Sequence, residues 1–213
     1  MTAIGDLHER AVQLHGSGLA RRVLGAFGWH VRFNGLPSRQ GVVIVYPHTS
    51  NWDFVIGLLA KWSIGFPLSF WGKDSLFSVP LFGRWLRWVG GVPVDRKHPR
   101  GVVGQMIERM QAAKANDEFC WLALAPEGTR SYRAHWRTGF YQVALNADVP
   151  LGLAYFDFVD RVVGVDTFVR LSGDAQADMA AIGSRLGHRR GCNPHLAAPV
   201  KLPGMDSEGD ARA

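Results

Sequence analysis

The stretch that decides the fold is Gly41-Val42-Val43-Ile44-Val45-Tyr46-Pro47-His48-Thr49-Ser50-Asn51-Trp52-Asp53-Phe54. Its first six residues are an apolar run that predicts a buried strand over 41–46. Ser50 stands three residues before Asp53 and just ahead of the apolar residues 54–59, and this spacing is typical of a helix start. We therefore predict a loop that carries His48, followed by a helix over 52–64 with Ser50 as its N-cap and Asp53 in its first turn.

The loop histidine and the helical aspartate can form a pair. On one continuous helix, residues five apart point about 140° away from each other, but a loop residue is free of that restriction. The positive end of the helix favours an ionised Asp53, which would hold one nitrogen of His48 and leave the other basic and exposed. Such a base suits an enzyme that deprotonates a hydroxyl of its substrate. A capped helix beside an ordinary loop histidine fits the pair equally well, so later segments have to decide.

Three further blocks follow predicted strands: Gly90-Gly91-Val92-Pro93-Val94-Asp95-Arg96, Ala125-Pro126-Glu127-Gly128-Thr129-Arg130-Ser131 and Val149-Pro150-Leu151-Gly152-Leu153-Ala154. The order and spacing of the four blocks resemble the glycerolipid acyltransferase family, whose type member makes phosphatidic acid from lysophosphatidic acid. The first block matches the family's His-x4-Asp motif and the third its Pro-Glu-Gly-Thr-Arg-Ser motif. The segment 73–83 also resembles the family's lysine-containing connection. The resemblance covers residues 40–155.

The resemblance implies a catalytic role for His48 as general base and for Asp53 as the group that orients it. It also implies that Arg96 and Arg130, with Lys73, bind a phosphate of the acceptor. Arginine offers a planar fork of donors that fits a phosphate. For a single arginine, a surface ion pair is the competing interpretation.

The other residues of the third block are expected to shape the same site. Glu127 accepts a hydrogen bond from a substrate hydroxyl or braces Arg130, and the sequence leaves both open. Gly128 permits a positive φ or a close approach of the backbone to a ligand. Thr129 either caps the following turn or touches the substrate.

Strands that alternate with helices predict an α/β fold: a single-domain sandwich with a central mixed, largely parallel sheet flanked by helices. Each block follows a strand, and ligands of such sheets bind at strand ends. We expect an N-terminal amphipathic helix over 7–28 and a lead-in within residues 1–35, an acyltransferase domain over 36–200, and a disordered tail over 201–213.

The composition of the chain limits the classes of partner and the compartment that we expect. The chain has 213 residues and a formal charge of +6, but it has no Lys/Arg-rich run and no zinc-ligand spacing, so nucleic acid and metal are not expected. Two cysteines at unrelated positions and the absence of a signal peptide predict a reducing, cytoplasmic compartment. Trp62, Trp71, Trp85 and Trp88 lie among basic residues, which suits peripheral contact with a membrane surface. Pro67 interrupts the apolar stretch 54–72, so no spanning helix is expected.

The expected function is transfer of a fatty acyl group from acyl-CoA or acyl carrier protein to a hydroxyl of a lysophospholipid, first of all lysophosphatidic acid. The thioester is a co-substrate, and no cofactor is expected. One alternative keeps the chemistry but changes the acceptor, for example to a lyso-ornithine lipid. Another is a non-catalytic peripheral lipid-binding protein. A serine hydrolase is disfavoured because the chain has no Gly-x-Ser-x-Gly elbow.

Overall fold

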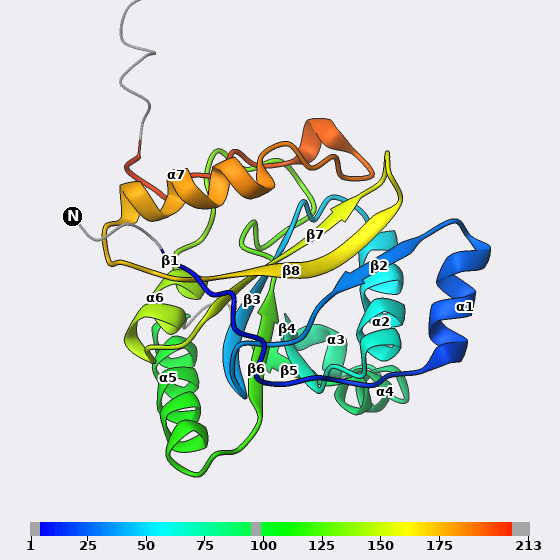
Figure 1. Ribbon diagram of the computed structural model, residues 1–213, viewed down its shortest axis with the longest axis horizontal. Helices are drawn as coiled ribbons and strands as arrows, with labels where there is room; N and C mark the ends of the chain where they lie inside the picture. Colours follow the sequence, from blue (N-terminus) through cyan, green and yellow to red (C-terminus); the bar gives the residue numbers. More distant parts are fainter. Residues whose placement is uncertain (1–4, 95–98, 206–213) are drawn as a thin grey trace, which may run out of the picture.

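The computed structural model describes residues 5–94 and 99–205 (Figure 1). The strands are β1 (Gly5–Asp6), β2 (His30–Phe33), β3 (Gln40–Tyr46), β4 (Leu68–Lys73), β5 (Gly91–Val94), β6 (Cys120–Leu124), β7 (Leu151–Asp157) and β8 (Val162–Arg170). The helices are α1 (Gly18–Ala26), α2 (Trp52–Ile64), α3 (Asp74–Phe77), α4 (Phe82–Trp88), α5 (Pro99–Ala115), α6 (Gly139–Asn146) and α7 (Ala175–Leu186), with a 3₁₀ turn at Pro194–Leu196.

Within these residues the strands form one mixed sheet in the order β1-β8-β7-β3-β6-β4-β5, with β2 paired to β8 beside this path. The pairs β3–β6, β3–β7, β4–β6 and β4–β5 are parallel, whereas β7–β8 and β1–β8 are antiparallel. The predicted α/β class with a largely parallel sheet is therefore confirmed. Because β3, β6 and β4 are parallel neighbours, the loops that follow them gather at one edge of the sheet.

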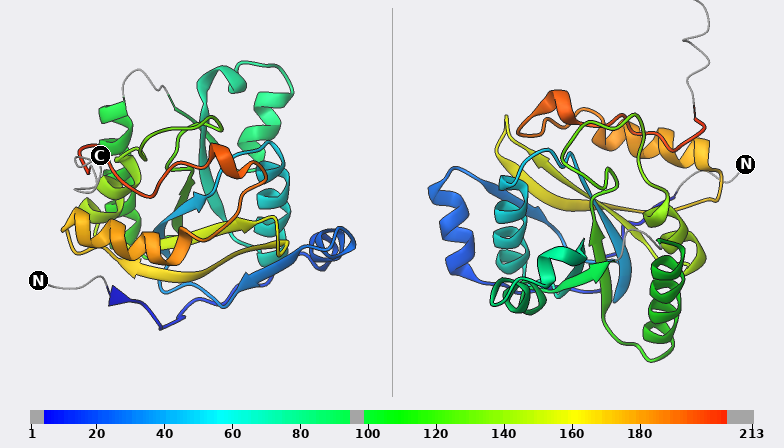
Figure 2. Two further views of the ribbon diagram at one scale, coloured as in Figure 1. Left: turned by 90° about the horizontal axis from the view of Figure 1, so that it is seen from above. Right: turned by 180° about the vertical axis from the view of Figure 1, so that it is seen from behind.

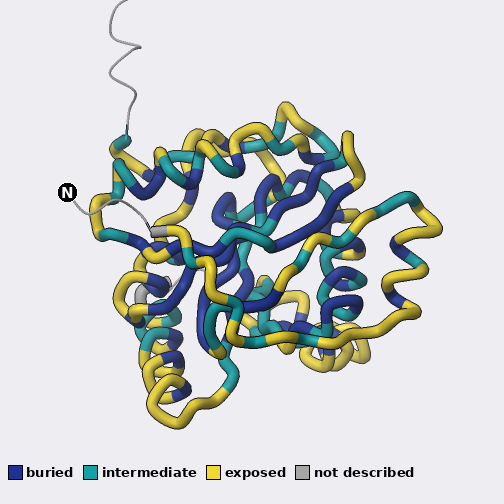
Figure 3. The backbone as a smooth tube through the Cα atoms, in the orientation of Figure 1, coloured by how far each residue is buried: buried dark blue, intermediate teal, exposed yellow. Residues whose placement is uncertain are grey.

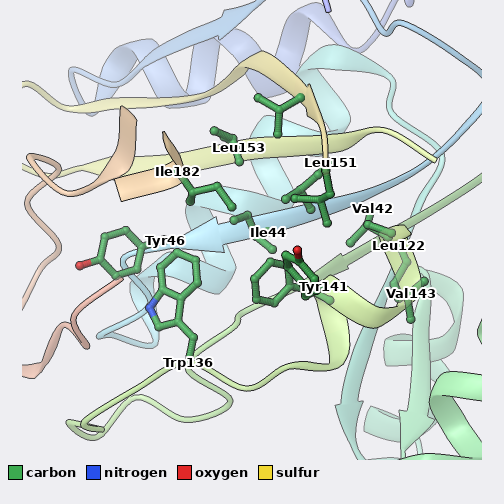
Figure 4. Close-up of a cluster of buried hydrophobic side chains, with 14 of the residues drawn as sticks. Val42, Ile44, Tyr46, Leu122, Trp136, Tyr141, Val143, Leu151, Leu153 and Ile182 are labelled. Atoms are coloured by element: carbon green, nitrogen blue, oxygen red, sulfur yellow. The ribbon is translucent and has the colours of Figure 1, made fainter. Parts of the chain in front are cut away.

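The central strands are buried on both faces, as expected for parallel strands covered by helices on each side (Figures 2 and 3). Val42 and Ile44 of β3 point into the larger core cluster, beneath α5, α6 and α7 (Figure 4). Val43, between them, packs with Trp121 and Phe168 on the other face. This alternation fixes the register of β3 and so the position of the His48 loop at its end.

The predicted N-terminal helix over 7–28 is wrong in its first half. Helix α1 begins only at Gly18, where the Oγ of Ser17 accepts the N–H of Ala20 at 3.3 Å. Before it the chain is extended, and Val12 exchanges two backbone hydrogen bonds with Leu36. A Cβ at Gly16 would lie 2.3 Å from the backbone N of Gly65. The glycine thus allows an extended arm to pack closely against the end of α2.

Two other segments differ from expectation. The helix predicted over 79–89 begins at Phe82, and the short α3 precedes it. At the C-terminus, Leu202 is buried in the larger core cluster, while residues 206–213 of the predicted tail lie outside the described residues. Among the described helices, none has the length and apolar character needed to cross a bilayer.

Candidate active site

The structure brings His48 and Asp53 together. His48 lies on the loop after β3, and its Nδ1 is 3.3 Å from the Oδ2 of Asp53. Asp53 is buried in the first turn of α2, where Oδ2 accepts the N–H groups of Thr49 and Ser50, each at 2.8 Å. Both donors belong to the loop that carries His48. Asp53 is therefore fixed in place beside the imidazole.

The helix start differs in detail from the predicted one. Asn51, not Ser50, is the N-cap residue, and its side chain makes no capping hydrogen bond. The carboxylate of Asp53 reaches back to the loop N–H groups instead, and the Oγ of Ser50 accepts the N–H of Trp52 at 3.2 Å. Asp53 therefore both accepts the N–H groups of the loop and faces His48.

The imidazole of His48 is held by proximity rather than by a formed hydrogen bond. Its Nδ1 is buried and finds no hydrogen-bond partner among the described residues, because the contact with Asp53 is poorly aligned. The His48 side chain keeps 19% of its surface exposed, so a substrate can reach it. Catalytic hydrogen bonds are commonly loose before substrate binds, and this geometry allows a small rotation to align the pair.

Glu127 holds the main chain of the His48 loop. It is buried at the end of β6, where Oε2 accepts the N–H of His48 at 2.7 Å and Oε1 accepts the N–H of Ala198 at 2.9 Å. The structure shows Glu127 bound to backbone N–H groups and not to Arg130, whose Nε donates to the carbonyl oxygen of Ser50. Burial raises the pKa of Glu127 to about 7 and the charge of Asp53 adds to this, while the two N–H donors oppose it.

The other residues of the third block lie beside this loop. Arg130 is exposed, and its Nε donates to the carbonyl oxygen of Ser50 at 3.0 Å. Gly128 has φ +68°, so the expected positive φ is confirmed, and a Cβ there would lie 2.4 Å from the Nε of Arg137. The Oγ1 of Thr129 accepts the N–H of Ser131 at 3.3 Å, which is the turn-capping alternative.

The remaining predicted ligands of phosphate come from neighbouring strands. Lys73 is exposed at the C-terminal end of β4, which pairs with β6. Its ammonium therefore belongs to the same edge of the sheet as Glu127 and Arg130. Arg96 follows β5 but lies outside the described residues.

Sequence reasoning missed the residues that close the site from the C-terminal side, which we call the C-terminal segment (residues 189–202). Asn193 donates its backbone N–H to the Oγ1 of Thr49 at 3.1 Å and its Nδ2 to the carbonyl oxygen of Thr49 at 2.9 Å. Ala198 donates to Glu127 and accepts from the hydroxyl of Tyr46 at 3.0 Å. These partners are up to 152 residues apart in sequence, so no local sequence pattern could have predicted the contacts.

The described residues contain no group of three or more His, Cys, Asp and Glu side chains that could hold a metal ion. The chemistry available at this site is that of a partly exposed imidazole backed by a buried carboxylate, with an arginine beside it. This arrangement can take a proton from a hydroxyl group and stabilise the imidazolium that forms.

Comparison with known proteins agrees with the site. The family model described as Acyltransferase matches residues 30–152, so the chain belongs to the acyltransferase family. It is 29% identical over 140 residues to a 1-acyl-sn-glycerol-3-phosphate acyltransferase of Pseudomonas aeruginosa, which covers 61% of this chain and 49% of the relative. The chain thus spans about half the length of the curated relative that it matches.

A solved structure shares the fold. The crystal structure of the 1-acyl-sn-glycerophosphate acyltransferase PlsC from Thermotoga maritima superposes with a TM-score of 0.52 and 14% sequence identity, over 78% of this chain and 73% of that one. His48, Asp53, Glu127 and Arg130 all lie inside the family-matched residues. The C-terminal segment lies outside them.

Glu127→Gln is expected to lower kcat by about 10²-fold, because an amide can accept only one of the two N–H groups and the His48 loop then shifts. The orphaned N–H costs about 1–3 kcal/mol of folding free energy, partly offset by loss of a buried charge. Steady-state kinetics and urea unfolding at pH 7.5 measure both effects. An unchanged kcat would show that the loop does not depend on this carboxylate.

The difference in unfolding free energy between wild type and Glu127→Gln should depend on pH. Because the folded pKa of Glu127, about 7, lies above its usual value of 4.5, the folded protein binds this proton more tightly than the unfolded chain. The contribution to stability is therefore complete below pH 4.5 and is lost as pH rises through about 7. We expect wild type to exceed Glu127→Gln in unfolding free energy by more at pH 5 than at pH 8. An equal difference at both pH values would contradict the raised pKa.

Proposed function

We propose that this protein transfers a fatty acyl group from a thioester, acyl-CoA or acyl carrier protein, to a hydroxyl of a lysophospholipid, and that the favoured acceptor is lysophosphatidic acid. The observation that carries the proposal is the imidazole of His48, 3.3 Å from a carboxylate that two N–H groups fix. Family membership and the name of the Pseudomonas aeruginosa relative support the acyl chemistry and the acceptor class.

The proposed reaction needs one base. His48 takes the proton of the acceptor hydroxyl as its oxygen attacks the thioester carbonyl, and Asp53 stabilises the imidazolium. The C–S bond then breaks, and the imidazolium returns the proton to the departing thiolate. An ester and a free thiol are the products, so atoms and charges balance. The reaction uses the thioester as co-substrate and no other cofactor or metal.

The acceptor's phosphate is proposed to lie against Arg130, with Lys73 and Arg96 adding charge. The hydrogen bond from Arg130 to the carbonyl oxygen of Ser50 engages one of the five N–H donors of the guanidinium and ties it to the His48 loop. A phosphate bound by Arg130 would therefore be held at a fixed distance from the base. This positioning is the physical reason to prefer a phosphorylated acceptor.

Arg130→Ala is expected to raise the KM for lysophosphatidic acid by about 10–100-fold, the effect of losing a charge-assisted contact, while kcat changes little. Arg130→Lys should be intermediate, because an ammonium keeps the charge but not the fork. Arg133→Ala is the matched control, an exposed arginine of the same loop. A fall in kcat at unchanged KM would assign Arg130 to the chemical step instead of to acceptor binding.

The decisive experiment incubates purified protein with lysophosphatidic acid and isotope-labelled acyl-CoA or acyl carrier protein, followed by lipid mass spectrometry. Labelled phosphatidic acid supports the proposal. If a phosphate-free acceptor such as a lyso-ornithine lipid is acylated and lysophosphatidic acid is not, the proposed acceptor is wrong and the acyl chemistry stands. Binding of these lipids without any turnover would favour a non-catalytic lipid-binding protein. Because the acceptor lies in a bilayer, the proposal includes peripheral attachment to the cytoplasmic face of the membrane.

A further inference from the structure

An exposed apolar surface lies over α3, α4 and the loop between them. We call it the aromatic face, and its members are Leu76, Val79, Leu81, Phe82, Trp85 and Trp88. Each of them is a large apolar side chain with more than a third of its surface exposed. Single exposed apolar residues are ordinary, but a set of this size on consecutive elements marks an interaction surface.

The face adjoins the helix that carries Asp53. The rings of Phe82 and Trp85 are stacked at 5.6 Å, and Phe54 on α2 lies 6.1 Å from Trp85 between ring centroids. Phe54 directly follows Asp53 in the first turn of α2. The aromatic face is therefore joined through Phe54 to the helix start that orients His48.

The backbone shows strain at the most exposed point of the face. Leu81 has φ 62° and ψ −52°, a conformation that a branched side chain rarely adopts, and its side chain is 76% exposed. The conformation belongs to a tight turn in which the N–H of Phe82 donates to the carbonyl oxygen of Pro80 at 2.7 Å, and this turn holds the Leu81 side chain out toward solvent. Strain of this kind is characteristic of functional segments.

The charges of the same region match an anionic surface. Residues 54–94 contain four basic side chains, Lys61, Lys73, Arg84 and Arg87, against the single acidic side chain of Asp74. Lys61 points inward, donates to the carbonyl oxygen of Val89, and burial lowers its pKa. Arg84 and Lys73 are exposed at the edge of the aromatic face. Exposed tryptophans bordered by such cations suit the headgroup region of a bilayer.

The tryptophans differ from the sequence-based expectation. Trp85 and Trp88 are exposed, but Trp62 is half-buried, with its ring 6.3 Å from that of Trp88. Trp71 packs against the larger core cluster. The tryptophans available for membrane contact are thus Trp85 and Trp88 of α4.

We infer that the aromatic face docks on a lipid bilayer that contains anionic headgroups, and that it presents a membrane-embedded acceptor to His48. The second half of this inference rests on the proposed function, whereas the docking itself does not. A lipid bilayer is favoured over a protein partner because the face combines exposed apolar side chains, exposed tryptophans and an excess of basic over acidic side chains. If the face instead binds a protein partner, the protein should not bind vesicles, or its binding to vesicles should not depend on their lipid composition.

The test is co-sedimentation with vesicles of phosphatidylcholine, with and without about 30% phosphatidylglycerol, a fraction chosen for strong negative surface potential. The double variant Leu81→Ser/Trp88→Ala removes side chains that are 76% and 75% exposed. The matched control is Leu19→Ser/Phe27→Ala on α1, where the side chains are 72% and 69% exposed. Figure 2 (left) shows α1 and α4 on opposite sides of α2.

We expect the α4 double variant to bind anionic vesicles at least about tenfold more weakly, from the loss of two membrane-buried apolar groups. Arg84→Gln should weaken binding to anionic vesicles about fivefold and leave the weak binding to neutral vesicles unchanged. The α1 control should bind like wild type. Equal losses in both double variants, or no binding by wild type, would overturn the inference.

An activity assay separates this inference from the proposed function. With a short-chain lysophosphatidic acid that is monomeric in water, the α4 double variant should keep the wild-type rate. With the same acceptor class embedded in vesicles, its rate should fall in parallel with its binding. Loss of both rates would mean that the face serves the chemistry itself and would overturn the docking role. If the variants bind vesicles in the expected pattern but the wild-type protein shows no turnover, only the proposed function is contradicted.

Discussion

Replacing His48 by alanine is expected to lower kcat for acyl transfer by about 10²–10⁴-fold, the usual contribution of a general base. The imidazole is the only side chain at this loop placed against a buried carboxylate, among the residues the structure describes. Its removal leaves Asp53 with its two N–H donors and Glu127 with the N–H of residue 48. The rate should therefore fall while the loop keeps its shape. Single-turnover kinetics with labelled donor measure this effect directly.

Two measurements make the result specific. The acceptor Kd, obtained by equilibrium binding, should change less than threefold. The protein should stay folded, because the loop keeps its hydrogen bonds to Asp53 and Glu127, although the loss of a largely buried ring lowers the thermal midpoint somewhat. His188→Ala, at an exposed histidine after α7, should turn over normally. A His48→Ala protein that retains more than a tenth of the wild-type kcat would eliminate the base mechanism.

Asp53→Asn is expected to produce the second large effect, a loss of at least about a hundredfold in kcat. In the serine-protease triad the equivalent change costs about 10⁴-fold. The amide oxygen can still accept the N–H groups of Thr49 and Ser50, so the helix start survives. What disappears is the negative charge 3.3 Å from His48, and with it the stabilisation of the imidazolium.

Asp53→Ala is the informative companion variant. It removes the charge and also leaves the two loop N–H groups without their acceptor, which costs about 1–3 kcal/mol for each buried donor. We expect Asp53→Asn and Asp53→Ala to be similarly slow, but only Asp53→Ala to show a clearly lower unfolding free energy in urea. If Asp53→Asn kept the wild-type kcat while Asp53→Ala lost it, the carboxylate would be structural and its charge irrelevant.

The local part of the fold could be predicted from sequence. The predicted strand 41–46 and helix 52–64 are observed as β3 (Gln40–Tyr46) and α2 (Trp52–Ile64). The apolar run is long enough for a strand buried on both faces, and Gly65, with φ 78°, ends the helix in the left-handed conformation that glycine favours. The contact between His48 and Asp53 could also be predicted, because the two residues are only five positions apart at the junction of a loop and a helix.

The rest could not be predicted because it depends on distant partners. The sequence predicts that Glu127 accepts a hydrogen bond from a substrate hydroxyl or braces Arg130, yet it holds the backbone of His48 and Ala198. Nothing in the third block reveals which N–H groups will surround it, because these come from residues 79 positions before it and 71 after it. The N-terminal arm is similar. Its apolar residues fit a helix, but the backbone hydrogen bonds of Val12 with Leu36 and the close packing of Gly16 on the end of α2 favour the extended path.

The long-range anchoring by Ala198 and Asn193 also has a consequence for biosynthesis. The ribosome makes the chain from the N-terminus, so His48, Asp53 and Glu127 emerge long before their C-terminal partners. Until residue 198 has been added, Oε1 of Glu127 lacks its N–H donor and Thr49 lacks the side chain of Asn193. A nascent chain therefore carries both His48 and Asp53 before it can fix the loop that holds them, and that loop gains its last backbone anchor only after residue 198 has been added.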